Sequence, residues 1–325
     1  MHSEPQQGGR SEMTDVDAVV RAPDSATEPS GPRWVTDGGL ETDLIFHHGL
    51  DLPGFAAYPL LDSTDGRALL SAYYAGYARI ADRAGANLLL ETPTWRANPD
   101  WVTSLGGSRD DVRRINIDSA VHLAGLVEFL EPSGEVELSG TIGPRGDGYV
   151  AGERATANEF AEYHRMQIAA FAEGGLERIT AYTLTTVPEA IGIVSAARNV
   201  GVRVGVAFTV ETDGRLPDGT TLADAAEELW ANAAPDGFLI NCAHPSHIAE
   251  ALRDDDSWAA RVTGLRVNAS RQSHAELDAA EELDEGDLDD LVTTHEQLAA
   301  RLPRLDVVGG CCGTDARHVA ALWGV

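Results

Sequence analysis

Residues 202–242 read VRVGVAFTVETDGRLPDGTTLADAAEELWANAAPDGFLINC. Two short apolar runs, 202–208 and 236–242, are rich in the residues that favour strands. Between them, residues 221–234 have the apolar spacing of an amphipathic helix, and Thr221 with Asp224 three residues later marks its start. The stretch therefore predicts a strand, a helix and a second strand.

The same unit recurs along the chain, which predicts a (β/α)₈ barrel, a fold of about 250 residues. A doubly wound open sheet is the alternative arrangement. The predicted strands are 34–37, 87–92, 135–142, 177–183, 202–208, 236–242, 264–269 and 304–310. The predicted helices are 66–84, 109–130, 156–174, 188–200, 221–234, 245–254, 286–302 and 315–323.

The first 32 residues differ in composition from the rest of the chain. Pro5, Pro23, Pro29 and Pro32 stand there among Ser, Glu, Gln and Gly, with little apolar content. Such composition does not support a packed core. We therefore predict a disordered tail over 1–32, followed by a single barrel domain over 33–325.

The charge of the 325-residue chain is strongly negative. It carries 52 acidic residues against 24 basic ones, for a formal net charge of −28, and every basic residue is arginine. A field of this sign repels nucleic acid and anionic lipid, which excludes both as partners. There is neither an apolar stretch of about 20 residues nor a signal-peptide pattern, so we expect a soluble, cytoplasmic protein.

The absence of lysine has two explanations: a GC-rich coding bias, or adaptation to a salt-rich cytoplasm. Coding bias replaces Lys with Arg but does not add Asp and Glu, so the acidity favours a halophilic protein. We then expect the melting temperature to rise between dilute buffer and molar KCl, because salt screens charge repulsion within about 3 Å at 1 M. A melting temperature that stays flat or falls would reject this interpretation.

Polar residues follow the predicted strands at their carboxyl ends, where barrel enzymes place their chemistry. These residues are Asp37, Glu91, Thr92, Thr141, Tyr182, Thr183, Thr209, Asn241, Cys242, Asn268, Cys311 and Cys312.

All three cysteines of the chain are among these strand-end residues. Cys242 follows the sixth strand, and the adjacent pair Cys311 and Cys312 follows the eighth, so three thiols face the same rim. Zn²⁺ binds thiolates at about 2.3 Å, and three protein ligands leave one position open for a substrate. The alternative is a buried small side chain at Cys242 beside an oxidisable dithiol.

Several motifs then resemble the zinc-dependent homocysteine S-methyltransferase family, in the family's order from about residue 34 to 325. The specific part is the distant Asn241-Cys242 with the closing Gly309-Gly310-Cys311-Cys312-Gly313-Thr314. The weaker parts are Asp37-Gly38-Gly39-Leu40-Glu41-Thr42, Glu91-Thr92 with Trp95, Gly140-Thr141-Ile142-Gly143-Pro144, and Pro245 after Asn241-Cys242.

The resemblance implies a (β/α)₈ barrel whose zinc is bound by Cys242, Cys311 and Cys312. It also implies methyl transfer from a sulfonium, betaine or folate-type donor to homocysteine, which gives methionine. The chain has no room for folate or cobalamin modules, so we expect a small donor such as S-methylmethionine or S-adenosylmethionine. The only catalytic group expected is the zinc-activated substrate thiolate. The predicted substrate-binding residues are Asp37, Gly38, Glu91, Thr92, Trp95, Tyr182 and Asn241.

One position departs from the family. After the fourth strand the family often carries an acid that helps hold the amino group of homocysteine, and Tyr182 stands there in this chain. Either another acid such as Glu91 or Asp37 binds the ammonium, or the acceptor is a different thiol. A non-catalytic zinc- or thiol-binding barrel, acting as a redox sensor through Cys311 and Cys312, is the alternative from another class.

Overall fold

The computed structural model describes residues 33–325, with the exception of residues 153 and 255. The predicted disordered tail, residues 1–32, lies outside the described residues.

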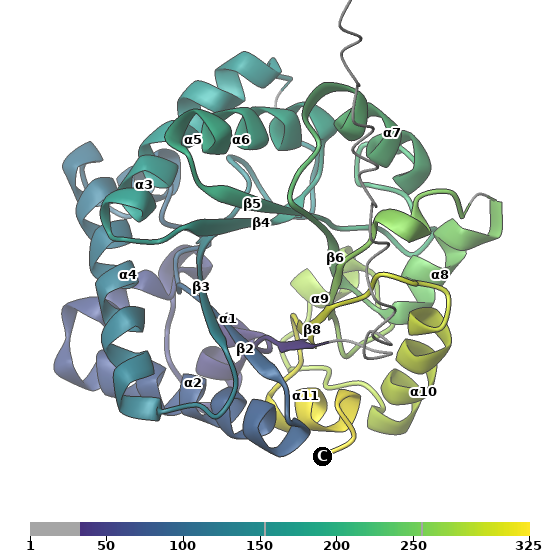
Figure 1. Ribbon diagram of the computed structural model, residues 1–325, viewed down its shortest axis with the longest axis horizontal. Coiled ribbons are helices and arrows are strands. Elements are labelled where there is room, and N and C mark those ends of the chain that lie inside the picture. Colours follow the sequence, from purple (N-terminus) through teal and green to yellow (C-terminus); the bar gives the residue numbers. More distant parts are fainter. Residues whose placement is uncertain (1–32, 153, 255) are drawn as a thin grey trace, which may run out of the picture. The chain divides into compact units, whose positions relative to one another are not determined.

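Eight parallel strands close into a barrel in the order of the sequence (Figure 1). Pairing of Trp34 with Val307 and of Val35 with Val308 joins the first strand to the last, which excludes the open sheet. The strands are β1 (Trp34–Val35), β2 (Asn87–Glu91), β3 (Val136–Ile142), β4 (Arg178–Leu184), β5 (Arg203–Phe208), β6 (Gly237–Ala243), β7 (Gly264–Val267) and β8 (Val307–Gly310). The predicted (β/α)₈ fold is confirmed.

The longer helices surround this barrel (Figure 1). The α-helices of the described residues are α1 (Leu40–Thr42), α2 (Thr64–Ala84), α3 (Pro99–Ser104), α4 (Arg109–Leu130), α5 (Ala157–Glu173), α6 (Val187–Val200), α7 (Leu222–Ala233), α8 (Pro245–Asp254), α9 (His274–Asp278), α10 (Leu288–Ala299) and α11 (Ala316–Leu322). A short π-helical segment, Asp43–His47, continues α1.

The predicted helix starts coincide with side-chain caps. In α4 the hydroxyl of Ser108 accepts a hydrogen bond from the amide of Asp111, whose carboxylate accepts one from the amide of Ser108. In α7 the hydroxyl of Thr221 accepts from the amide of Asp224. Each capping side chain accepts a hydrogen bond from a backbone amide that the first helical turn leaves free. The start of the helix is therefore determined by neighbouring residues in the sequence.

The main core lies between the strands and the surrounding helices. Phe171 on α5, Phe208 on β5, Phe238 on β6 and Trp258 after α8 are almost completely buried in it. This core holds the strands rigidly and leaves their carboxyl ends free to carry polar groups.

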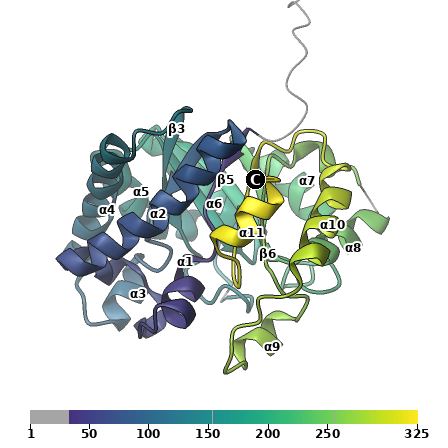
Figure 2. The ribbon, with the colours of Figure 1, turned by 90° about the horizontal axis from the view of Figure 1, so that it is seen from below.

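The loops after the strands carry three short helices that periodicity did not predict. They are α1 after β1, α3 after β2 and α9 after β7, each of six residues or fewer. Figure 2 shows α3 and α9 at the lower end of the barrel. Within the described part of the chain, no helix is long and apolar enough to cross a membrane.

Candidate active site at the carboxyl ends of the strands

One pocket at this rim collects all of the residues predicted to bind substrate or metal. Its empty space amounts to about 600 Å³ when the part open to solvent is included. The predicted residues that line it are Asp37, Gly38, Glu91, Thr92, Trp95, Tyr182, Asn241, Cys242, Cys311 and Cys312.

The three sulfur atoms converge in this pocket. The Sγ atoms of Cys242 and Cys312 are 3.5 Å apart, and those of Cys242, Cys311 and Cys312 all lie within 4.8 Å of one another. Cys242 is buried, whereas Cys311 and Cys312 are half-buried toward the pocket. Side chains separated by 70 positions in the sequence therefore form one cluster.

Cys242 is held by an unusual backbone. Its φ is 55°, in the left-handed region, and the pairing of β6 with β7 shifts register between Asn241 and Ala243. The carbonyl of Cys242 lies 2.6 Å from Nε2 of His274 on α9. Thr183 and Phe55 have similar φ values of 60° and 57°, and both line the same pocket. Strained residues of this kind cluster at functional sites, where the surrounding structure maintains them.

The adjacent pair Cys311 and Cys312 lies in a tight turn after β8. The hydroxyl of Thr314 donates to the carbonyl of Cys311 at 2.7 Å. A Cβ on Gly39 would approach the same carbonyl oxygen to 2.5 Å, so only glycine allows α1 to pack this closely. The Asp-Gly-Gly motif and the vicinal cysteines are thus parts of one contact.

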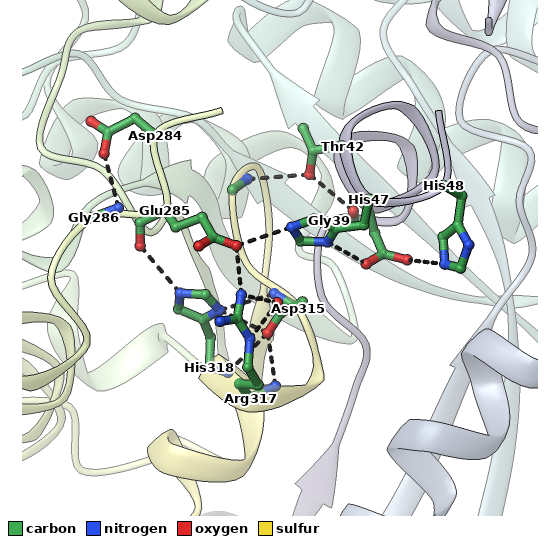
Figure 3. A network of polar contacts seen from close by, with 12 residues as sticks. Gly39, Thr42, His47, His48, Asp284, Glu285, Gly286, Asp315, Arg317 and His318 are labelled. Atoms are coloured by element: carbon green, nitrogen blue, oxygen red, sulfur yellow. Dashed lines mark hydrogen bonds and ion pairs between the residues drawn. The ribbon is translucent and has the colours of Figure 1, made fainter. Parts of the chain in front are cut away.

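A polar network holds the residues that follow the turn of Cys311 and Cys312 (Figure 3). Arg317 bridges Asp315 at 2.6 Å and Glu285 at 2.5 Å, and Nε2 of His47 also lies 3.0 Å from Glu285. Nδ1 of His318 contacts Asp315 at 3.0 Å. His47, Glu285 and Asp315 have the spacing of metal ligands, but the guanidinium of Arg317 already supplies the cation. The network connects α11, the π-helical segment and the loop that contains Glu285.

Tyr149 contacts the cysteine cluster and was not predicted. Its hydroxyl is 3.4 Å from Sγ of Cys242 and 3.3 Å from Sγ of Cys312. Burial raises the pKa of Tyr149 well above its usual value, so the hydroxyl stays protonated and is able to donate a hydrogen bond to either sulfur. No local signal in the sequence connects Tyr149 with the thiols.

Arg266 forms the floor of the pocket and was also missed. Its guanidinium lies 2.5 Å from Oδ1 of Asp37 and 2.6 Å from Oε2 of Glu91, and it stacks 4.8 Å over the ring of Tyr182. It also donates to the carbonyls of Gly38 and Gly310. Burial raises the pKa of Asp37 to about 7, although Arg266 opposes the shift. The sequence carried one signal, a single charged residue inside the apolar run of β7.

The donor set suits zinc. Four tetrahedral ligands at a Zn–S distance of about 2.3 Å are about 3.8 Å apart. The sulfurs of Cys242 and Cys312 are 3.5 Å apart, close to this value, and all three sulfurs lie within 4.8 Å of one another. Hydrogen bonds from Cys242 and Cys312 lower the pKa of Cys311 well below its usual value, whereas the pKa values of Cys242 and Cys312 are raised, so without a metal the three thiols share one thiolate. Nδ2 of Asn241 lies 3.8 Å from Sγ of Cys311, where it donates to that sulfur.

Fold and site together define a (β/α)₈ protein with a trio of cysteines at the catalytic rim. Comparison with known proteins specifies the class further. The family model described as homocysteine S-methyltransferase matches residues 34–324. The chain therefore belongs to the homocysteine S-methyltransferase family and is a methyltransferase, as the motifs predicted.

Individual relatives agree with this assignment. The chain is 24% identical to homocysteine S-methyltransferase 3 of Zea mays, a match that spans 91% of this chain and 90% of the maize protein. It is 25% identical to homocysteine S-methyltransferase 2 of Zea mays over 94% of this chain and 95% of that protein. The metallated form of the homocysteine methyltransferase MmuM from Escherichia coli has the same fold, with a TM-score of 0.71 at 20% identity over 91% of this chain and 96% of that one.

Proposed function

We propose that the protein transfers a methyl group from a small sulfonium donor, S-methylmethionine or S-adenosylmethionine, to the thiol of homocysteine, and that it depends on zinc held by Cys242, Cys311 and Cys312. The observation that carries the proposal is the convergence of three sulfurs in the pocket that also contains the predicted substrate-binding residues. The family assignment supports the same reaction class.

The chemistry needs an ionised acceptor. A free thiol has a pKa near 8.5, so little of it is thiolate at neutral pH. When bound, zinc would supply the Lewis acidity that removes this proton. The acceptor sulfur then attacks the methyl carbon, and the electron pair of the breaking carbon–sulfur bond returns to the donor, which leaves as a neutral thioether.

The chain's own residues place these groups. Cys242, Cys311 and Cys312 lie where the acceptor thiol has to arrive. Asn241 donates a hydrogen bond to the sulfur of Cys311, and the hydroxyl of Tyr149 lies at hydrogen-bond distance from the other two sulfurs, to which it is able to donate. Such donors moderate the negative charge that three thiolates bring together. Holding the sulfur and the methyl group in line is the larger contribution expected of the pocket.

The donor fits the mouth of the pocket. A second, outer pocket opens beside the first, and the two share Phe55, Trp95, Tyr149 and Cys312 in their walls. A sulfonium is attracted to aromatic faces, so this junction suits the transferable methyl group. The outer pocket also carries acidic side chains at Asp147, Asp278, Glu282 and Asp284.

The test is a methyl-transfer assay. Purified protein with zinc, homocysteine and S-methylmethionine or S-adenosylmethionine labelled in its methyl group is expected to give labelled methionine by mass spectrometry. A chelator should stop the reaction, and added zinc should restore it. Absence of methylation of any thiol with any sulfonium or betaine donor would overturn the proposal.

The thiol-sensor alternative draws on the 3.5 Å separation between the sulfurs of Cys242 and Cys312. It predicts a metal-free protein whose cysteines oxidise reversibly. Zinc analysis separates the two functions, because the enzyme should hold about one zinc per chain and its thiols should resist modification until a chelator is added.

A further inference from the structure

Two acids predicted to bind the ammonium group of the acceptor, Asp37 and Glu91, already pair with other side chains of the protein. Oδ1 of Asp37 is paired with Arg266 at 2.5 Å, and Oδ2 accepts a hydrogen bond from the hydroxyl of Tyr73 at 3.3 Å. Oε2 of Glu91 accepts from Arg266 at 2.6 Å, from Tyr182 at 2.7 Å and from Thr36 at 3.2 Å. These oxygens have little capacity left for a substrate.

Two carboxylates in the same pocket keep capacity for a ligand. Glu91 is only 2% exposed, and its Oε1 atom has no hydrogen-bond partner among the described residues. Glu41, a half-buried residue, also lines the pocket, and among the described residues its carboxylate is paired with its own backbone amide rather than with another side chain. An unpaired buried acceptor is costly unless a ligand supplies the donor.

The side chains that line the pocket carry more negative than positive charge, which favours a cationic ligand. Asp37, Glu41 and Glu91 are three carboxylates, and Arg266 is the one guanidinium among the pocket's lining residues. Because burial raises the pKa of Glu41 to about 7, a positive group placed beside it would also complete its ionisation.

We propose that Glu41 recognises the ammonium group of the acceptor, with the free Oε1 of Glu91 as a second acceptor of its N–H bonds. Glu41 thereby supplies, from the loop after β1, the carboxylate that Tyr182 does not offer at the end of β4. The inference rests on the proposed function in taking the acceptor to be an α-amino thiol. It makes Glu41 a specificity-determining residue, whereas Arg266 orients Asp37 and Glu91.

Binding measurements on the zinc-loaded protein test this role without requiring turnover. Titration calorimetry would compare homocysteine with 4-mercaptobutyrate, which is the same molecule without the amino group. The wild type should bind homocysteine about 10- to 100-fold more tightly, as expected for a hydrogen-bonded charge pair. Glu41→Gln should remove this preference while leaving the affinity for 4-mercaptobutyrate and the zinc content unchanged.

Two further variants serve as controls. Asp51→Asn makes the same charge change at an exposed position ten residues away, and it should keep the preference for homocysteine. Glu41→Asp retains the carboxylate and should recover part of the preference, which also provides a reading if Glu41→Gln folds poorly.

The outcomes separate this inference from the proposed function. Equal affinity of the wild type for both ligands, or an undiminished preference in Glu41→Gln, would overturn the role of Glu41. The methyl-transfer assay on the same wild-type preparation reports on the reaction independently. Selective homocysteine binding without any methyl transfer would therefore sustain Glu41 and reject the reaction.

Discussion

The Cys311→Ser variant is expected to lose its zinc and more than about 99% of kcat/KM for methyl transfer while keeping the barrel. Even residues that only support a metal ligand typically contribute 10- to 100-fold, so loss of a ligand should cost at least about 100-fold. Serine offers a neutral, harder oxygen whose proton the metal would have to displace. The fold should persist because a large core, separate from the cysteines, holds the strands.

Zinc content, circular dichroism and turnover measured on the same preparation check this prediction. Cys242→Ser and Cys312→Ser should behave alike, and a double variant should add little, because the three ligands act as a unit. Zinc and activity retained in any one variant would remove that cysteine from the site. Loss of the circular dichroism signal would instead make the metal structural.

Arg266→Met should lower the free energy of unfolding by about 3–5 kcal/mol, the range for breaking a buried ion pair from one side. Methionine keeps much of the side chain's length but leaves the buried carboxylates of Asp37 and Glu91 facing each other without a cation. Urea unfolding monitored by tryptophan fluorescence measures the change.

Two companion variants make the result specific. Arg165→Met breaks an exposed ion pair with Glu162 and should change the stability little, because solvent screens such pairs. Adding Asp37→Asn and Glu91→Gln to Arg266→Met should recover part of the loss by removing the unpaired charges. A single Arg266→Met variant as stable as the wild type would show that the guanidinium does not balance these acids.

The barrel was predictable because its signals are local. Runs such as 202–208 and 236–242 identify strands, and caps such as that of Ser108 mark helix starts, so the predicted elements lie within a few residues of the observed ones. The short helices α1, α3 and α9 were missed because six residues or fewer do not establish a 3.6-residue period.

The sequence predicted those residues of the pocket that lie at the carboxyl ends of strands. Position at the carboxyl end of a strand selected Glu91, Cys242 and their neighbours, which do line one pocket. Arg266 and Tyr149 were missed because their importance depends on partners distant in the sequence. Arg266 is separated by 229 positions from Asp37, and Tyr149 by 163 positions from Cys312. No pattern in one sequence records such contacts.

X-ray absorption at the zinc edge tests the cysteine site most directly. The purified, zinc-loaded protein should show three sulfur ligands from the chain at about 2.3 Å, and Cys311→Ser should lose sulfur from this shell. A shell composed only of nitrogen and oxygen, or a fully active protein that contains no zinc, would contradict the assignment of the metal to Cys242, Cys311 and Cys312.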